Sequence, residues 1–247
     1  MRQCRKAWES TWVSFNDWKL FISKDMISSM KELYRDQPEL FTIKEARMLC
    51  EGYRYEIDSI ISVWNKMKSY CSDDRLSDDE LALLLARVSK LAKEIIGLCK
   101  EMIQFVENCS LFQNMDAQES YYDQCNLSVF YHKTIGDAHR IVSLVTLGNE
   151  RKEAALAALN AYRVAYTFSK ELGTRNVNSI DLAVGMGEFY EMIGLLKTAM
   201  HIEKEAYDNA ICGCYFDDEE VFECAPYMQR LRDNLTLQLS DLGEDEE

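Results

Sequence analysis

The sequence has few residues that end helices or build tight turns. Its 247 residues include only 2 prolines and 10 glycines. A β-sheet protein of this length needs many turns, and those turns draw heavily on Gly, Pro and Asn-Gly pairs. The shortage therefore argues against a sheet-rich fold and favours long helices. We predict an all-α chain.

Positive charge is also scarce. The chain carries 28 Lys plus Arg against 42 Asp plus Glu, a formal net charge of −14. This balance argues against nucleic acid or an anionic membrane as the main partner, so any anion-binding site must be local. Much of the acid falls in runs that are typical of solvated loops and chain ends. These runs lie at residues 73–74, 78–80, 217–220 and 244–247.

No long apolar run opens the chain. The first residues, MRQCRKAWESTW, lack the apolar segment of a signal peptide, and the nine cysteines are odd in number and widely scattered. We therefore expect a reducing, cytoplasmic location without disulfides. Cys212, Cys214 and Cys224 do not match the spacing of zinc ligands. His132 and His139 share one helical face, but Asp137 is near them only in sequence, so we expect no metal site.

Motifs of common enzyme classes are missing as well. The chain has no G-x-S-x-G, no Walker loop and no H-E-x-x-H, and the pair Gly185-x-Gly187 lies in a helical context rather than after a strand. We therefore predict no catalytic residue, no cofactor and no enzymatic activity.

Apolar residues recur every three or four positions along most of the chain, which is the period of an amphipathic helix. One helix is predicted at residues 42–70, and another begins at the capping box Ser77–Glu80 and reaches Phe105. The remaining predicted helices lie at residues 3–16, 20–35, 116–145, 150–172, 179–193, 195–213 and 217–240. The sequence thus predicts nine antiparallel helices with short links.

Two segments have weak internal similarity. GNERKEAALAALNAYRVAYTFSKEL and LLKTAMHIEKEAYDNAI place small residues and tyrosines where the hairpins of tetratricopeptide-like proteins pack closely, although a 34-residue repeat does not hold along the chain. We therefore predict a helical-hairpin superhelix with a concave face.

Five segments, in order along the chain, resemble the 14-3-3 family. They are MKELYRDQPEL (30–40), FYHKTIGDAHR (130–140), AYRVAYTFSKE (161–171), EAYDNAI (205–211) and MQRLRDNLTLQLSD (228–241). The resemblance implies a nine-helix, usually dimeric adaptor of signal transduction. It implies an amphipathic groove that holds an extended peptide containing phosphoserine or phosphothreonine.

A phosphate group carries nearly two charges and three acceptor oxygens, so two or more cationic donors must converge on it. An asparagine side chain can fix the peptide backbone, because an amide both donates and accepts hydrogen bonds. Matched position by position, the resemblance implies a phosphopeptide site made of Arg54, Lys133, Asp137, Arg140, Glu191, Tyr227, Arg230 and Asn234.

Several positions depart from the family pattern. Ile61 and Asn65 stand where the resemblance implies arginines, and Ile141 replaces an implied tyrosine. The implied asparagine of the seventh helix falls at Val184 or Gly185. Because a charged hydrogen bond contributes roughly 1.5–3 kcal/mol, these losses predict weakened or altered phosphate recognition. On the last helix, Pro226 and Arg230 stand where leucines are implied, and Gln238 replaces a tryptophan.

Two alternatives stay open at this point. Arg140 and Asp137 are three residues apart and can form a simple ion pair within one helix, and Arg54 can be a rim charge beside the apolar stripe. The chain as a whole can be a helical scaffold that binds unphosphorylated peptides. Affinity that ignores phosphorylation would distinguish this scaffold from a phosphopeptide adaptor.

The resemblance also implies a domain organisation and an assembly. Residues 1–240 form one domain, with a dimerisation half at 1–106 and a groove half at 115–240, followed by an acidic flexible tail at 241–247. Ile22 and Arg87 stand where the family's ion pairs across the dimer are implied. We therefore predict a homodimer held mainly by apolar contacts, to which the N-terminal residues Trp8, Trp12, Phe15, Leu20 and Phe21 contribute.

Overall fold

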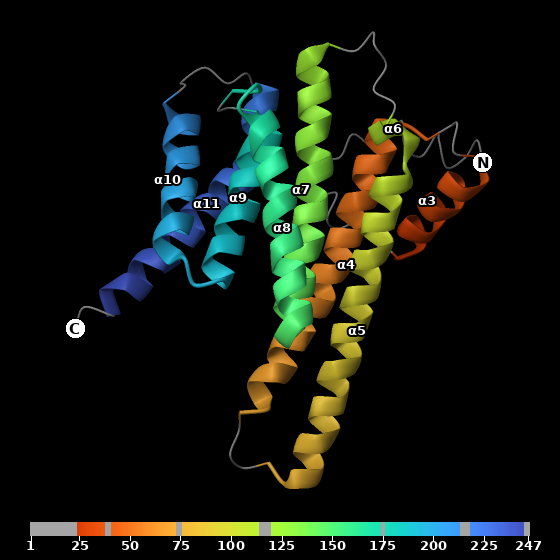
Figure 1. The fold of residues 1–247 in the computed structure, drawn as a ribbon, viewed down its shortest axis with the longest axis vertical. Helices are drawn as coiled ribbons and strands as arrows, with labels where there is room; N and C mark the ends of the chain where they lie inside the picture. Colours follow the sequence, from red (N-terminus) through yellow and green to blue (C-terminus); the bar gives the residue numbers. More distant parts are fainter. Residues whose placement is uncertain are drawn as a thin grey trace. The chain divides into compact units, whose positions relative to one another are not determined.

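The computed structural model describes residues 24–37, 41–72, 76–113, 120–173, 176–212 and 218–244. Every regular element in these ranges is a helix, which confirms the all-α fold class. The elements are α3 (Lys24–Asp36), α4 (Ile43–Tyr70), α5 (Asp78–Asn108), α6 (Ser110–Gln113), α7 (Tyr121–Val145), α8 (Gly148–Ser169), α9 (Val177–Met192), α10 (Leu196–Ile211) and α11 (Asp218–Glu244), as Figure 1 shows.

Within the described ranges, eight helices have at least 13 residues, one fewer than the nine that we predicted. The first predicted helix, at residues 3–16, lies outside the described residues, as do the N-terminal apolar side chains proposed for the dimer. The short helix α6 was not predicted. Helix α11 continues to Glu244, and residues 245–247 of the acidic tail again lie outside the described residues.

The start of α5 shows how a local sequence sets a helix end. Ser77 has extended backbone angles, and its side chain accepts a hydrogen bond from the backbone N–H of Glu80. In return, the backbone N–H of Ser77 donates to the Glu80 carboxylate at 2.9 Å. This reciprocal pair satisfies two N–H groups that the first turn leaves without partners. The predicted capping box is confirmed.

The chain divides into two compact units, residues 1–59 and residues 60–247, with the boundary inside α4. In the first unit, α3 and the first part of α4 supply the buried residues Ile27, Met30, Leu49 and Tyr53. The ammonium group of Lys31 lies 4.3 Å from the centre of the Tyr53 ring. The sequence-predicted cation Arg54 belongs to this unit.

In the second unit, α7 and α8 run side by side (Figure 1). Small residues make this close packing possible. α8 buries alanines at helical spacing, namely Ala154, Ala158, Ala161 and Ala165. On α7, a Cβ atom at Gly136 would lie 2.7 Å from the ring of Tyr162, so only glycine fits against this ring. The small residues that the sequence places at 150–172 therefore bring two helix backbones together.

α9 is the central element of the second unit. Ten of its residues are buried, and it packs against α7, α8, α10 and α11. The surrounding apolar cluster includes Ile180 and Val184 of α9 with Leu231 of α11. Because α9 contacts all these neighbours, any charged side chain on it must find partners across a helix interface. In the described part of the chain, no helix is both long and apolar enough to span a membrane.

Candidate functional site

Three charged side chains of α7 share one helical face. Lys133, Asp137 and Arg140 follow one another at spacings of four and three residues, which places them in line along the helix. Lys133 Nζ lies 2.8 Å from Oδ2 of Asp137 and 2.5 Å from Oδ2 of Asp181 on α9. The side chains of Lys133 and Asp137 are each 3% exposed, and that of Asp181 is 9% exposed. One buried ammonium group thus joins α7 to α9 through two carboxylates.

Tyr162 of α8 connects this buried triad to Arg140. Its hydroxyl donates a hydrogen bond to Oδ1 of Asp137 at 2.7 Å, and Tyr162 also lies near enough to Arg140 to influence the pKa of the guanidinium. Burial and the Asp137 carboxylate raise the pKa of Tyr162 well above its ordinary value. The phenol therefore keeps its proton, which lets it donate to Asp137.

A single carboxylate on α9 binds two of the four cations in the predicted phosphopeptide site. Arg140 Nη2 lies 2.9 Å from Oε2 of Glu188, and Arg230 Nη2 of α11 contacts the other oxygen, Oε1. The side chains of Arg140 and Glu188 are each 17% exposed, whereas that of Arg230 is 47% exposed. Two guanidinium groups on one anion is the arrangement that a phosphate would require. Here the protein itself supplies the anion.

The electrostatics of Arg140 reflect this internal anion. Burial by itself disfavours the charged guanidinium, yet the neighbouring Glu188, Tyr162 and Asp137 raise the pKa of Arg140 above its ordinary value. Glu188 was not among the predicted site residues. A signal for it exists in the sequence, because Glu188 follows Asp181 by seven residues in a mostly apolar helix, which puts both carboxylates on one face.

The structure also gives a reason for the missing asparagine of α9. A Cβ atom at Gly185 would lie 2.8 Å from Oδ1 of Asp137 and 3.3 Å from the hydroxyl of Tyr162. Any side chain at this position would therefore displace the buried hydrogen bond between those two residues. Val184, the other position at which the resemblance implies an asparagine, is itself buried in the core.

The predicted backbone clamp, Asn234, binds a glutamate of its own chain. Its Nδ2 donates to Oε1 of Glu203 on α10 at 2.7 Å. Gln238, one turn further along α11, donates through Nε2 to Oε2 of Glu203 at 2.8 Å and to Glu191 at 3.1 Å. The amides of α11 thus hold α9 and α10 together. The implied tryptophan at position 238 is replaced by a fully buried amide.

Glu203 is a buried carboxyl group with an unusual proton affinity. Burial raises the pKa of Glu203 to about 7, against the hydrogen bonds from Asn234 and Gln238, and the nearby Glu188 and Glu191 raise it further. Gly187 makes room for it, since a Cβ atom there would overlap the Glu203 carboxyl. The amides of Asn234 and Gln238 donate hydrogen bonds to this carboxyl group. Protonation of Glu203 therefore affects the hydrogen bonds that connect α11 to α10.

Stability should depend on pH through Glu203. The pKa in the folded state, about 7, lies above the ordinary value of 4.5, so the folded protein holds a proton that the unfolded chain releases between these values. The free energy of unfolding should therefore fall as the pH rises through this window, by up to about 3 kcal/mol. Glu203→Gln, which mimics the protonated form, should be more stable than the wild type at pH 8 and similar to it near pH 4.5.

Urea unfolding followed by circular dichroism at several pH values measures this difference. Glu153→Gln on α8 is a matched control, because Glu153 is exposed and the same carboxyl-to-amide change there should leave the pH curve of the wild type intact. Parallel stability curves for the wild type and Glu203→Gln would contradict the prediction.

The other predicted positions have separate surroundings. Arg54 forms an ion pair with Glu51 at 3.0 Å within α4, as a rim charge would. Tyr227 packs against the apolar cluster around Ile180 and Leu231. Among the positions that depart from the family pattern, Ile141 is buried, Ile61 is half-buried and Asn65 is exposed.

Comparison with known proteins identifies the family of this chain. A family model described as "14-3-3 protein" matches residues 21–238. The chain belongs to the 14-3-3 family. It is 30% identical to 14-3-3 protein 9 of Solanum lycopersicum over 228 residues, which cover 90% of this chain and 84% of the relative.

Two further 14-3-3 relatives have a similar sequence identity to this chain. The chain is 31% identical to a 14-3-3-like protein of Fucus vesiculosus, with 90% of this chain and 86% of the relative covered. It is 31% identical to 14-3-3-like protein B of Vicia faba, with 91% and 84% covered. Membership of the 14-3-3 family supports a general role as an adaptor that binds phosphopeptides.

Proposed function

We propose that this protein is an adaptor that binds peptide segments of partner proteins on the face formed by α7, α9 and α11, with weakened recognition of phosphate. The observation that supports this proposal is the carboxylate of Glu188, which contacts both Arg140 and Arg230. An incoming phosphate must displace this carboxylate and then remain beside it. Two like charges at contact distance repel each other, and this repulsion offsets the attraction of the two cations.

The competing hypothesis is a scaffold that binds unphosphorylated peptides. The same observation favours it in part, because the Glu188 carboxylate already pairs with both guanidinium groups. Asn234 is also engaged, since its Nδ2 donates to Glu203. A peptide that binds mainly through apolar contacts and its backbone would leave these pairs intact. The two hypotheses differ in how strongly affinity depends on phosphorylation.

Matched peptides that differ by one phosphate test the proposal. We expect the phosphoserine peptide to bind the wild-type protein more tightly than its serine counterpart by less than about tenfold, which corresponds to about 1.4 kcal/mol. A single charged hydrogen bond that nothing opposes contributes roughly 1.5–3 kcal/mol, so a smaller gain indicates weakened phosphate recognition. Fluorescence anisotropy with a library of peptide pairs gives both dissociation constants.

Each possible outcome distinguishes between the two hypotheses or contradicts both. A gain of a hundred-fold or more on phosphorylation would show that phosphate recognition is intact and that the proposed weakening is wrong. Equal affinities for all pairs would favour the scaffold. An absence of binding to every peptide in the library would contradict both.

We further propose that the protein works in the cytoplasm as a homodimer. The family membership supports both statements in general terms. Arg87, which stands where a glutamate of the family's dimer contact is implied, is exposed on α5. Light scattering at several salt concentrations tests the assembly, because a dimer held mainly by apolar contacts keeps its mass as the salt concentration rises.

A further inference from the structure

A second concave surface lies on the opposite side of α9. A cavity of about 760 Å³ is lined by α8, α9 and α10. From α9 it takes Ala183, Met186 and Tyr190, whereas Asp181 and Glu188 point toward the partners described above. At 100° per residue these two sets fall on opposite faces of the helix. The cavity is therefore separate from the face proposed for client peptides.

The floor of this cleft is apolar and elongated. Leu182, Ala183 and Met186 of α9 form it together with Ile202 and Ala206 of α10. The short side chains of Ala183 and Ala206 leave open space above the floor. The lining of α9 extends from residue 179 to residue 190, which is roughly 16 Å at 1.5 Å per residue. That is the length of a three-turn helix.

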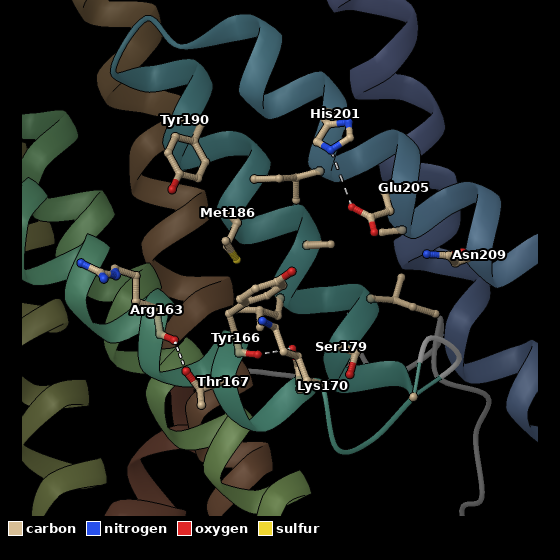
Figure 2. A pocket seen from close by; sticks show the side chains of 17 residues that line it. Arg163, Tyr166, Thr167, Lys170, Ser179, Met186, Tyr190, His201, Glu205 and Asn209 are labelled. Carbon is tan, nitrogen blue, oxygen red and sulfur yellow. Dashed lines mark hydrogen bonds and ion pairs between the residues drawn. The ribbon is translucent and has the colours of Figure 1, made fainter.

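The two walls of the cleft differ in charge. The α8 wall carries Arg163 and, directly after the end of the helix, Lys170, and both side chains are exposed. Neither cation has an ion-pair partner among the described residues, although the Lys170 ammonium lies 4.7 Å from the centre of the Tyr166 ring. The α10 wall carries His201 and Glu205, 3.9 Å apart. Figure 2 shows the labelled side chains of α8 and of α10 on opposite sides of Met186.

The lining offers little to an extended peptide backbone. Thr167 donates its hydroxyl proton to the backbone oxygen of Arg163, and Ser169 donates to that of Tyr166. An extended segment would therefore leave many N–H and C=O groups without partners in the cleft. A helix satisfies its own backbone and needs only side-chain contacts, which makes it the better occupant of an apolar groove between two helices.

We propose that this cleft binds an amphipathic helix of a partner protein, with its apolar stripe on the floor and an acidic edge along the α8 wall. Arg163 and Lys170 are seven residues apart, so carboxylates two turns apart on the bound helix face both of them. The α10 wall, with His201 and Glu205, faces the uncharged polar edge of the same helix.

The experiment uses two helical peptides of 14 residues, each with a Leu and Met stripe and one Gln edge. The second edge is Glu in one peptide and Lys in the other. The chain has a net charge of −14, which by itself favours the Lys peptide. We nevertheless expect the Glu peptide to bind at least tenfold more tightly in fluorescence anisotropy, because the local wall is cationic.

The variant Arg163→Glu with Lys170→Glu is expected to reverse this preference. Both positions are exposed, so the fold should be retained, and circular dichroism checks this. An excess of phosphoserine peptide should not displace the Glu peptide, since the two bind different faces. Displacement, equal affinity of the two edges, or no saturable binding of either peptide would each overturn the proposal. Equal affinity of the two edges or absence of binding leaves phosphate recognition at Arg140 untouched, so the two proposals can fail separately.

Discussion

Glu188→Ala should raise the affinity for a phosphoserine peptide by about ten- to a hundred-fold, because removal of one carboxylate frees two cations for the phosphate. The Glu188 side chain contacts both Arg140 and Arg230. A charged hydrogen bond contributes roughly 1.5–3 kcal/mol, which corresponds to a factor of about ten or more for each contact regained. The affinity for the unphosphorylated peptide should stay within about twofold. Paired anisotropy titrations of both peptides measure the effect.

Two companion variants separate the effect of the Glu188 charge from the effect of its side-chain volume. Glu188→Gln removes the negative charge but keeps the volume, so its gain should be smaller than that of Glu188→Ala. Adding Arg140→Met to Glu188→Ala should cancel the gain, and the resulting double-mutant cycle gives the coupling between phosphate and Arg140. The melting temperature of each variant should be measured as well, because Glu188→Ala removes one partner of the half-buried Arg140 guanidinium. A stable Glu188→Ala variant with unchanged phosphopeptide affinity would show that Arg140 and Arg230 are not phosphate ligands.

The second large effect concerns Lys133. Lys133→Met should lower the free energy of unfolding by about 3–5 kcal/mol, because it removes the buried ammonium group that two buried carboxylates contact. Asp137 and Asp181 both contact this ammonium group, at 2.8 Å and 2.5 Å. Urea denaturation at neutral pH measures the loss.

A control and a rescue make this prediction specific. Lys204 forms an ion pair with Asp208 at 2.6 Å within α10, but its side chain is 69% exposed. Lys204→Met should therefore cost less than about 1 kcal/mol. Adding Asp137→Asn and Asp181→Asn to Lys133→Met should recover most of the lost stability, since no buried charge then remains at the triad. Equal losses for the two lysine variants would contradict the argument from burial.

The sequence was sufficient to predict most helices. α4, α5 and α7 through α11 appear close to their predicted ranges, because long runs of apolar residues at helical spacing are interrupted by few turn residues. The start of α5 was predicted more sharply than most helix boundaries, since a capping box is a local interaction between Ser77 and Glu80. The short helix α6 escaped prediction, because four residues carry no measurable period.

The candidate site was less predictable, for a physical reason. Lys133, Asp137 and Arg140 share a face through spacing along one helix, which a sequence displays directly. Their partners Asp181 and Glu188 come from another helix, and which side chains meet across an interface depends on packing that no single spacing fixes. The engagement of Asn234 by Glu203 escaped prediction for the same reason.

The contact of Glu188 with two arginines can also be expressed as an effective concentration. A carboxylate tethered beside two guanidinium groups is an internal ligand at an effective concentration on the order of millimolar or higher. A free anion must exceed this value to compete, whereas a protein client can add contacts elsewhere on α9 and α11. It follows that residues flanking the phosphorylated position, rather than the phosphate itself, should decide which clients this adaptor selects.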